Sequence, residues 1–169
     1  MSKKDSSRHL QHKEVWAHHQ VVFFDEAFTN RACGSGAFSV LKTCNYFNFW
    51  WNNGSRSKNR VDLIALWGPL LCANWLSIED LAIFGDSKVT IDWINNCSNF
   101  ARPLLCNWMH NITHLKSCFK EITFSHVGKG HNIVTDALSM QGHQLRMGEI
   151  HFKVFYTRSL QSTNKIPTC

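Results

Sequence analysis

The chain has 169 residues, a formal net charge of +6 and an isoelectric point near 9.0. Hydrophobic residues make up 44% of the sequence, which is enough for a packed core and excludes a wholly disordered protein. The length fits one domain with tails, and the positive charge favours an anionic partner, of which nucleic acid is the usual one.

The N-terminal residues and the cysteines indicate the compartment. Residues 1–9 are polar and lack the apolar stretch of a signal peptide, and no apolar run approaches a membrane-spanning length. The 7 cysteines include no Cys-x-x-Cys pair, so they indicate neither a zinc knuckle nor a disulfide framework. We therefore expect an intracellular protein, cytoplasmic or nuclear and not secreted, with no membrane partner and no disulfide-linked partner.

The first predicted elements form an antiparallel meander. Residues 1–19 are polar and rich in histidine, and we expect a disordered tail there. The apolar run 20–25 predicts a buried strand, and the glycines within 28–36 predict a turn. Residues 37–41 and 46–51 predict two further strands.

A predicted helix follows a loop at 52–58. Apolar residues at helical spacing predict this helix over 59–75, and Pro69 lies inside it. An interior proline removes a backbone hydrogen bond and costs about 3 kcal/mol or bends the helix. Residues 81–84 then predict a buried strand.

Helices and strands continue to alternate in the second half. The predicted elements are helices at 87–96, 103–119 and 132–140 and a strand at 122–127. Residues 142–169 lose this periodicity, so we expect a poorly defined C-terminal tail with at most a stray strand at 152–156. The folded domain is therefore expected to span 20–141.

Four aspartates lie in distinctive local sequences, in the order strand end, helix start, strand end, helix. They are Asp25 after Val21-Val22-Phe23-Phe24, Asp62 in Asn59-Arg60-Val61-Asp62, Asp86 after Ile83-Phe84-Gly85, and Asp136 in Asn132-Ile133-Val134-Thr135-Asp136. Taken singly, each has a plain explanation, because aspartate is common in turns and at helix N-caps. Carboxylates gathered at one point, however, need divalent cations to offset their repulsion, and hard oxygen ligands suit magnesium.

This order of carboxylates resembles that of ribonuclease H of type 1, and in particular the plant branch found in retrotransposon-derived proteins. Asn132 and His126 precede Asp136 at the family's spacing. The resemblance covers about residues 20–141. It implies an α/β, ribonuclease H-like fold with a mixed five-stranded sheet flanked by helices, and the predicted succession of elements agrees with such a layered fold.

The resemblance also implies a function, namely an endoribonuclease that hydrolyses the RNA strand of RNA–DNA hybrids. In the family, the residues that match Asp25, Asp62, Asp86 and Asp136 bind two Mg²⁺ ions, and Mn²⁺ is an expected substitute. Two ions can position a water and stabilise charge on the attacking and leaving oxygens. The residue that matches His126 assists proton transfer or product release, which suits an imidazole near its ordinary pKa.

Nucleic-acid contacts are expected from Asn59, Lys88 and Asn132, although a solvated surface lysine is the plainer explanation of Lys88.

Two other groups of residues, the histidines of one predicted helix and the tryptophans, also have plainer explanations than ligand binding. His110 and His114 lie one helical turn apart, but no third zinc ligand is evident. Most tryptophans fit core or sheet packing, and Trp50-Trp51 is the pair whose alternation can send one ring outward to stack on a base. The packing assignment covers Trp50, Trp51, Trp67, Trp75, Trp93 and Trp108.

The sequence departs from the family at three positions. Active members usually have glutamate where Asp62 stands, and the missing methylene withdraws the carboxylate by roughly 1.3–1.5 Å. Glu26 stands where glycine is common, and Pro69 lies about two turns after Asp62. Two alternatives therefore stay open beside the enzyme: a catalytically impaired nucleic-acid-binding module, and a fragment of a retrotransposon polyprotein, which would explain the tails. The sequence does not set the oligomeric state.

Overall fold

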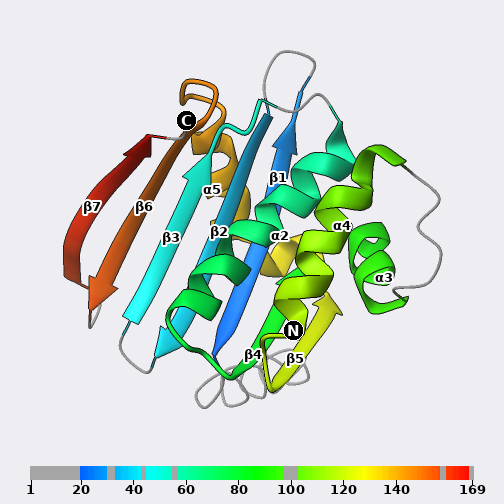
Figure 1. Ribbon diagram of the computed structural model, residues 1–169. Helices are drawn as coiled ribbons and strands as arrows, with labels where there is room; N and C mark the ends of the chain where they lie inside the picture. Colours follow the sequence, from blue (N-terminus) through cyan, green and yellow to red (C-terminus); the bar gives the residue numbers. More distant parts are fainter. Residues whose placement is uncertain are drawn as a thin grey trace, which may run out of the picture.

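A seven-stranded mixed sheet forms the centre of the protein, with helices on both faces (Figure 1). The computed structural model describes residues 20–29, 33–42, 45–54, 57–96, 103–156 and 159–167. The strand order is β5-β4-β1-β2-β3-β6-β7. The expected tail at 1–19 lies outside the described residues.

The predicted meander is present and longer than expected. The strands β1 (Val21–Phe28), β2 (Cys33–Lys42) and β3 (Asn45–Trp51) pair in antiparallel succession. Two shorter strands, β4 (Asp80–Gly85) and β5 (Glu121–His126), extend the sheet in parallel from β1. Because parallel strands end at the same edge, the residues that follow β4 and β5 lie beside the middle of β1.

Helices α2 (Lys58–Trp75), α3 (Lys88–Asn96) and α4 (Pro103–Lys116) lie on one face of the sheet. Helix α2 packs on β1 and β2, and α4 packs against α2. Three leucines of α2 are completely buried: Leu63, Leu66 and Leu70 are each 0% exposed. Pro69 lies inside α2 and is buried, and the helix continues past it to Trp75.

The other face carries α5 (Ile133–Gly142), which follows the short 3-10 turn η1 (Lys129–His131). Helix α5 packs directly on β2, because Gly34 and Gly36 leave room for its backbone. A Cβ atom at Gly36 would collide with the backbone of Thr135 and Ser139. These glycines therefore fix the distance between α5 and the sheet.

The C-terminal residues form two more strands, β6 (Glu149–Tyr156) and β7 (Ser159–Pro167). Strand β6 pairs with β3, and β7 pairs with β6 at the sheet edge. The expected count of five strands is therefore wrong. Where a poorly defined tail was expected, at 142–169, the structure has these two paired strands. Ile150 and Phe152 pack against the core at a spacing of two, a short pattern that aromatic residues on both faces obscure.

Among the described residues, no helix combines the length and apolar character needed to cross a membrane. Trp50 and Trp51 are both buried, at 6% and 5% exposure, so neither ring of this pair is available to stack on a base. Trp75 ends α2 with its side chain 83% exposed, which corrects the expectation of core packing there.

Candidate active site

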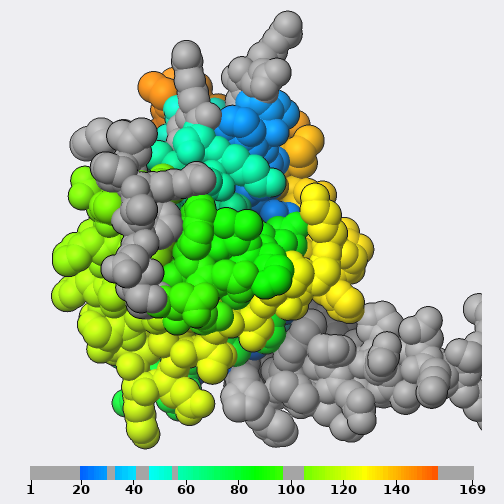
Figure 2. Space-filling model, turned by 90° about the vertical axis from the view of Figure 1, so that its right-hand side faces the viewer, coloured from blue at the N-terminus to red at the C-terminus, as the bar shows by residue number. Residues whose placement is uncertain are grey.

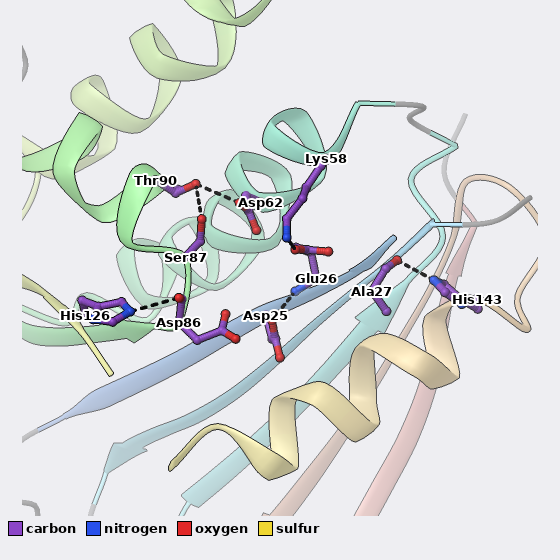
Figure 3. A network of polar contacts seen from close by, with 10 residues as sticks. All are labelled: Asp25, Glu26, Ala27, Lys58, Asp62, Asp86, Ser87, Thr90, His126 and His143. Carbon is purple, nitrogen blue, oxygen red and sulfur yellow. Dashed lines mark hydrogen bonds and ion pairs between the residues drawn. The ribbon is translucent and has the colours of Figure 1, made fainter. Parts of the chain in front are cut away.

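The strand ends bring two of the four aspartates together. Strands β1 and β4 run in parallel, and their last paired residues are Phe24 and Gly85. The next residues are Asp25 and Asp86, whose side chains approach each other (Figure 3). Asp25 was expected at a strand end, but β1 continues to Phe28, so the end of β4 defines the site.

Burial and the neighbouring acid both favour a proton on this pair. The pKa of Asp25 is raised from 3.8 to about 8, first by burial and then by the charge of Asp86. The backbone N–H of Glu26 donates to Asp25 Oδ1 at 2.8 Å and opposes part of this rise. A divalent cation can bind two adjacent carboxyl groups in place of the proton that they favour when no metal is bound. Asp25 and Asp86 therefore fit one hard divalent ion such as Mg²⁺ or Mn²⁺.

His126 adjoins this pair from the third parallel strand. It ends β5 and pairs in register with Gly85, the residue before Asp86. Its Nε2 lies 3.1 Å from the backbone oxygen of Asp86, and the side chain is exposed. Figure 2 shows blue β1 surface bordered by the green of β4 and α3 and by the yellow and orange of the segment from β5 to α5. This edge of the sheet is thus accessible from outside.

Asp62 lies in the second turn of α2, and one of its carboxylate oxygens faces Thr90 on α3 (Figure 3). It is 1% exposed, and its Oδ2 accepts a hydrogen bond of 2.9 Å from Thr90 Oγ1. Ser87 Oγ in turn lies 3.0 Å from Thr90 Oγ1. Burial, and then the charge of Glu26, raises the pKa of Asp62 from 3.8 to about 6, although hydrogen bonds from Ser87 and Thr90 oppose the rise.

Glu26 forms an ion pair with Lys58 at the start of α2. The distance from Lys58 Nζ to Glu26 Oε1 is 2.9 Å, and the Glu26 side chain is 9% exposed. The pKa of Lys58 is raised, first by the hydrogen bond to Glu26. Successive residues of a strand point to opposite faces, so Glu26 faces α2 while Asp25 faces away from it. The family's glycine position is therefore occupied here by a paired acid.

Asp136 is exposed on α5, four residues after Asn132. Within the described residues, no group of three or more histidine, cysteine or acidic side chains is arranged to hold a metal ion. The structure brings Asp25 and Asp86 together and does not gather all four aspartates. The donor set for one ion is thus present, whereas the expected four-carboxylate set for two ions is not assembled.

Asn132, Asn59 and Lys88 have different surroundings. Asn132 is 2% exposed, and its Nδ2 donates to the backbone oxygen of Phe24 at 2.9 Å, so it anchors α5 to β1 instead of facing a phosphate. Lys88 is exposed and pairs with Asp92 at 2.7 Å on the same helix. Asn59 is half-buried in the first turn of α2, near the site.

Three residues of this site, Lys58, Ser87 and Thr90, were not singled out from the sequence. Ser87 directly follows Asp86, and Thr90 lies one helical turn after it, which is a weak signal for a contact within α3. Nothing in the sequence links Lys58 to Glu26, because 32 positions and two strands separate them.

The sequence matches the family model described as "Reverse transcriptase-like" over residues 24–142. That range contains all four aspartates and ends before β6 and β7. Among curated proteins, none matches the sequence with significance.

Several solved structures share the fold. The RNase H1 of the halophilic archaeon Halobacterium salinarum NRC-1 is 19% identical, with a TM-score of 0.65 over 73% of this chain and 96% of its own. An N-terminal RNase H domain from Mycobacterium tuberculosis is 20% identical, with a TM-score of 0.66 over 75% of this chain and 94% of its own. LC11-RNase H1, solved in complex with an RNA/DNA hybrid, is 15% identical, with a TM-score of 0.66 over 74% and 96%. At these identities the likeness confirms the predicted α/β, RNase H-like fold.

Proposed function

The chain belongs to the reverse transcriptase-like family, and from this premise we propose that it binds RNA–DNA hybrids and hydrolyses their RNA strand. The observation that carries the proposal is the meeting of Asp25 and Asp86 at the ends of neighbouring parallel strands. One structure with the same fold holds an RNA/DNA hybrid, which supports this class of ligand. The net charge of +6 favours the same polyanionic partner.

The residues of the site suit phosphodiester hydrolysis. Asp25 and Asp86 would hold Mg²⁺ or Mn²⁺, which would stabilise negative charge on the phosphate oxygens and make a bound water more acidic. A bound ion would favour the charged form of Asp25 over the protonated form that burial and the charge of Asp86 otherwise favour. His126, exposed beside Asp86, can hold a proton on Nε2 and pass it to solvent or to a leaving oxygen.

A second function is favoured by a specific observation, the orientation of Asp62. Its carboxylate is bonded to Thr90 and buried, and Asp136 lies exposed on α5. A chain with this arrangement can keep the fold and bind a hybrid without cutting it. This catalytically impaired binding module is the alternative, and a fragment of a retrotransposon polyprotein would behave in the same way in an assay.

The test is cleavage of an end-labelled RNA–DNA hybrid with Mg²⁺, with Mn²⁺ or with a chelator. We expect metal-dependent cleavage that Asp86→Asn abolishes. Asp80→Asn is the matched control, because Asp80 is exposed at the opposite end of the same strand, β4. Hybrid binding without cleavage in either metal would make the binding module the function, and cleavage that persists in chelator would refute the metal assignment.

Two broader assignments belong to the same proposal. We place the protein inside the cell, in the cytoplasm or nucleus, and derive it from the plant, retrotransposon-derived branch of type 1 ribonucleases H. The local sequences around the four aspartates support the second assignment. Microscopy of the tagged protein tests the first assignment.

A further inference from the structure

Two consecutive acidic residues, Asp25 and Glu26, divide the acids of the site into two groups. Alternation along β1 directs Asp25 toward Asp86 and directs Glu26 toward α2, where Asp62 also lies (Figure 3). Figure 3 shows Glu26 and Asp62 on either side of the Lys58 ammonium, which is ion-paired with Glu26. Both acids of the second group are largely shielded from solvent: the Glu26 side chain is 9% exposed, and Asp62 is 1% exposed.

Lys58 supplies a cation to this second group. Its Nζ lies 2.9 Å from Glu26 Oε1, and it begins α2 one turn before Asp62. Asp62 and Asp86 also act on the Lys58 ammonium, although less than Glu26 does. The side chain of Lys58 is 60% exposed, so the residue contributes charge here and little core packing.

We propose that Lys58, held by Glu26, is an internal cation that neutralises the Glu26–Asp62 group and limits the chain to one divalent ion, bound at Asp25 and Asp86. The inference rests on the proposed function, because it concerns the same site. Thr90 reinforces the arrangement by holding one oxygen of the Asp62 carboxylate toward α3. Lys58 acts here as a positioning residue, and it contacts no reacting atom.

The physical argument is competition between cations. Removal of the ammonium leaves Glu26 and Asp62 buried without a counter-charge, which is costly. Protons and divalent ions then compete to neutralise them, and the ion gains as the pH rises above about 6, the raised pKa of Asp62. We therefore expect Lys58→Met, which keeps the apolar stem, either to bind a second Mn²⁺ ion or to bind Mn²⁺ about tenfold more tightly, as expected for the loss of one nearby positive charge.

The experiment is calorimetric titration of the full chain with Mn²⁺, which requires no nucleic acid and no catalysis. The natural protein should bind one ion per chain. Lys120→Met is the matched control, because it makes the same change of charge at an exposed position before β5, at the opposite end of that strand from His126. The double variant Lys58→Met/Glu26→Gln should return close to the natural affinity, because the unpaired acid is removed as well.

The outcomes separate this inference from the proposed function. Equal stoichiometry and affinity in Lys58→Met and Lys120→Met would overturn the role of Lys58 while leaving the Asp25–Asp86 site intact. Two ions in the natural protein would also overturn it, in favour of the family's two-ion site. If Asp86→Asn binds Mn²⁺ as well as the natural protein does, the metal site of the proposed function fails instead.

Discussion

The contact between Asp25 and Asp86 should make the metal-free protein less stable at pH 8 than at pH 5, and Asp86→Asn should relieve that loss. An aspartate whose pKa is higher in the folded than in the unfolded chain binds more protons when folded. Stability is therefore retained below the unfolded pKa of 3.8 and falls as the pH rises toward about 8, the folded value. This shift of about 4 pH units corresponds to on the order of 5 kcal/mol lost across the interval.

Burial is the first cause of the shift and the charge of Asp86 is the second, so the substitution removes only part of it. A neighbouring like charge commonly raises a carboxyl pKa by about 1–2 units, or on the order of 2 kcal/mol. For a chain of this length we expect Asp86→Asn to raise the melting temperature by roughly 4–8 °C at pH 8 in chelator. At pH 4, where Asp25 is protonated in both proteins, the gain should be close to zero.

The assay is thermal unfolding followed by circular dichroism at pH 4, 5, 6, 7 and 8, with and without Mn²⁺. Asp80→Asn controls for the change of net charge and, as an exposed substitution, should shift stability by about 0.5 kcal/mol or less. Mn²⁺ should stabilise the natural protein and not Asp86→Asn. If Asp86→Asn destabilises the protein equally at pH 5 and pH 8, the two carboxyl groups do not repel each other as the structure indicates.

Three further predictions concern the neighbouring residues and the ligand. Thr90→Val should lower the free energy of unfolding by about 1.5–3 kcal/mol, because the buried Asp62 carboxylate loses the hydrogen bond from Thr90. Chemical denaturation measures this loss. The control is Thr123→Val on the exposed side of β5, which should cost far less. Hybrid affinity should fall steeply as salt rises, because binding releases counterions from the phosphates; an affinity that is flat in fluorescence anisotropy between low and moderate salt contradicts this. Asp62→Glu should raise the initial rate of hybrid cleavage, because one more methylene gives the carboxylate about 1.3–1.5 Å of added reach toward a bound ion, and equal rates in both proteins would show that reach is not limiting.

Much of the fold follows from patterns within the sequence. The buried runs of β1 and β4, and the aspartate that follows each of them, predicted that Asp25 and Asp86 would meet, because neighbouring parallel strands end at one edge. The helix at 59–75 was also predicted despite Pro69, since the buried leucines of α2 outweigh one missing hydrogen bond. These features depend on periodicity and on strand ends, which a single sequence displays.

The side-chain partners could not be predicted in this way. The bond from Thr90 to Asp62 depends on how α2 and α3 pack, and the ion pair of Lys58 with Glu26 depends on how α2 sits over β1. The stray strand expected at 152–156 lies within β6, but its pairing with β3 is long-range and could not be predicted from local pattern. Sequence spacing therefore predicted which strand or helix carries each carboxylate, but it did not predict the orientation of the side chain.

The direction of each carboxylate, more than its presence, decides what this site can hold. Asp25 and Asp86 are directed at each other by the register of β1 and β4, which the core fixes, so this pair is as rigid as the sheet. Asp62 is directed by the hydroxyl groups of Thr90 and Ser87, and Glu26 is directed by a single ammonium, that of Lys58. A hydrogen bond to a charged group contributes about 1.5–3 kcal/mol, and an ion pair with an exposed partner about 0–1 kcal/mol. Substitutions at Thr90 and Lys58 can therefore redirect the second acidic group while the fold and the first pair stay unchanged.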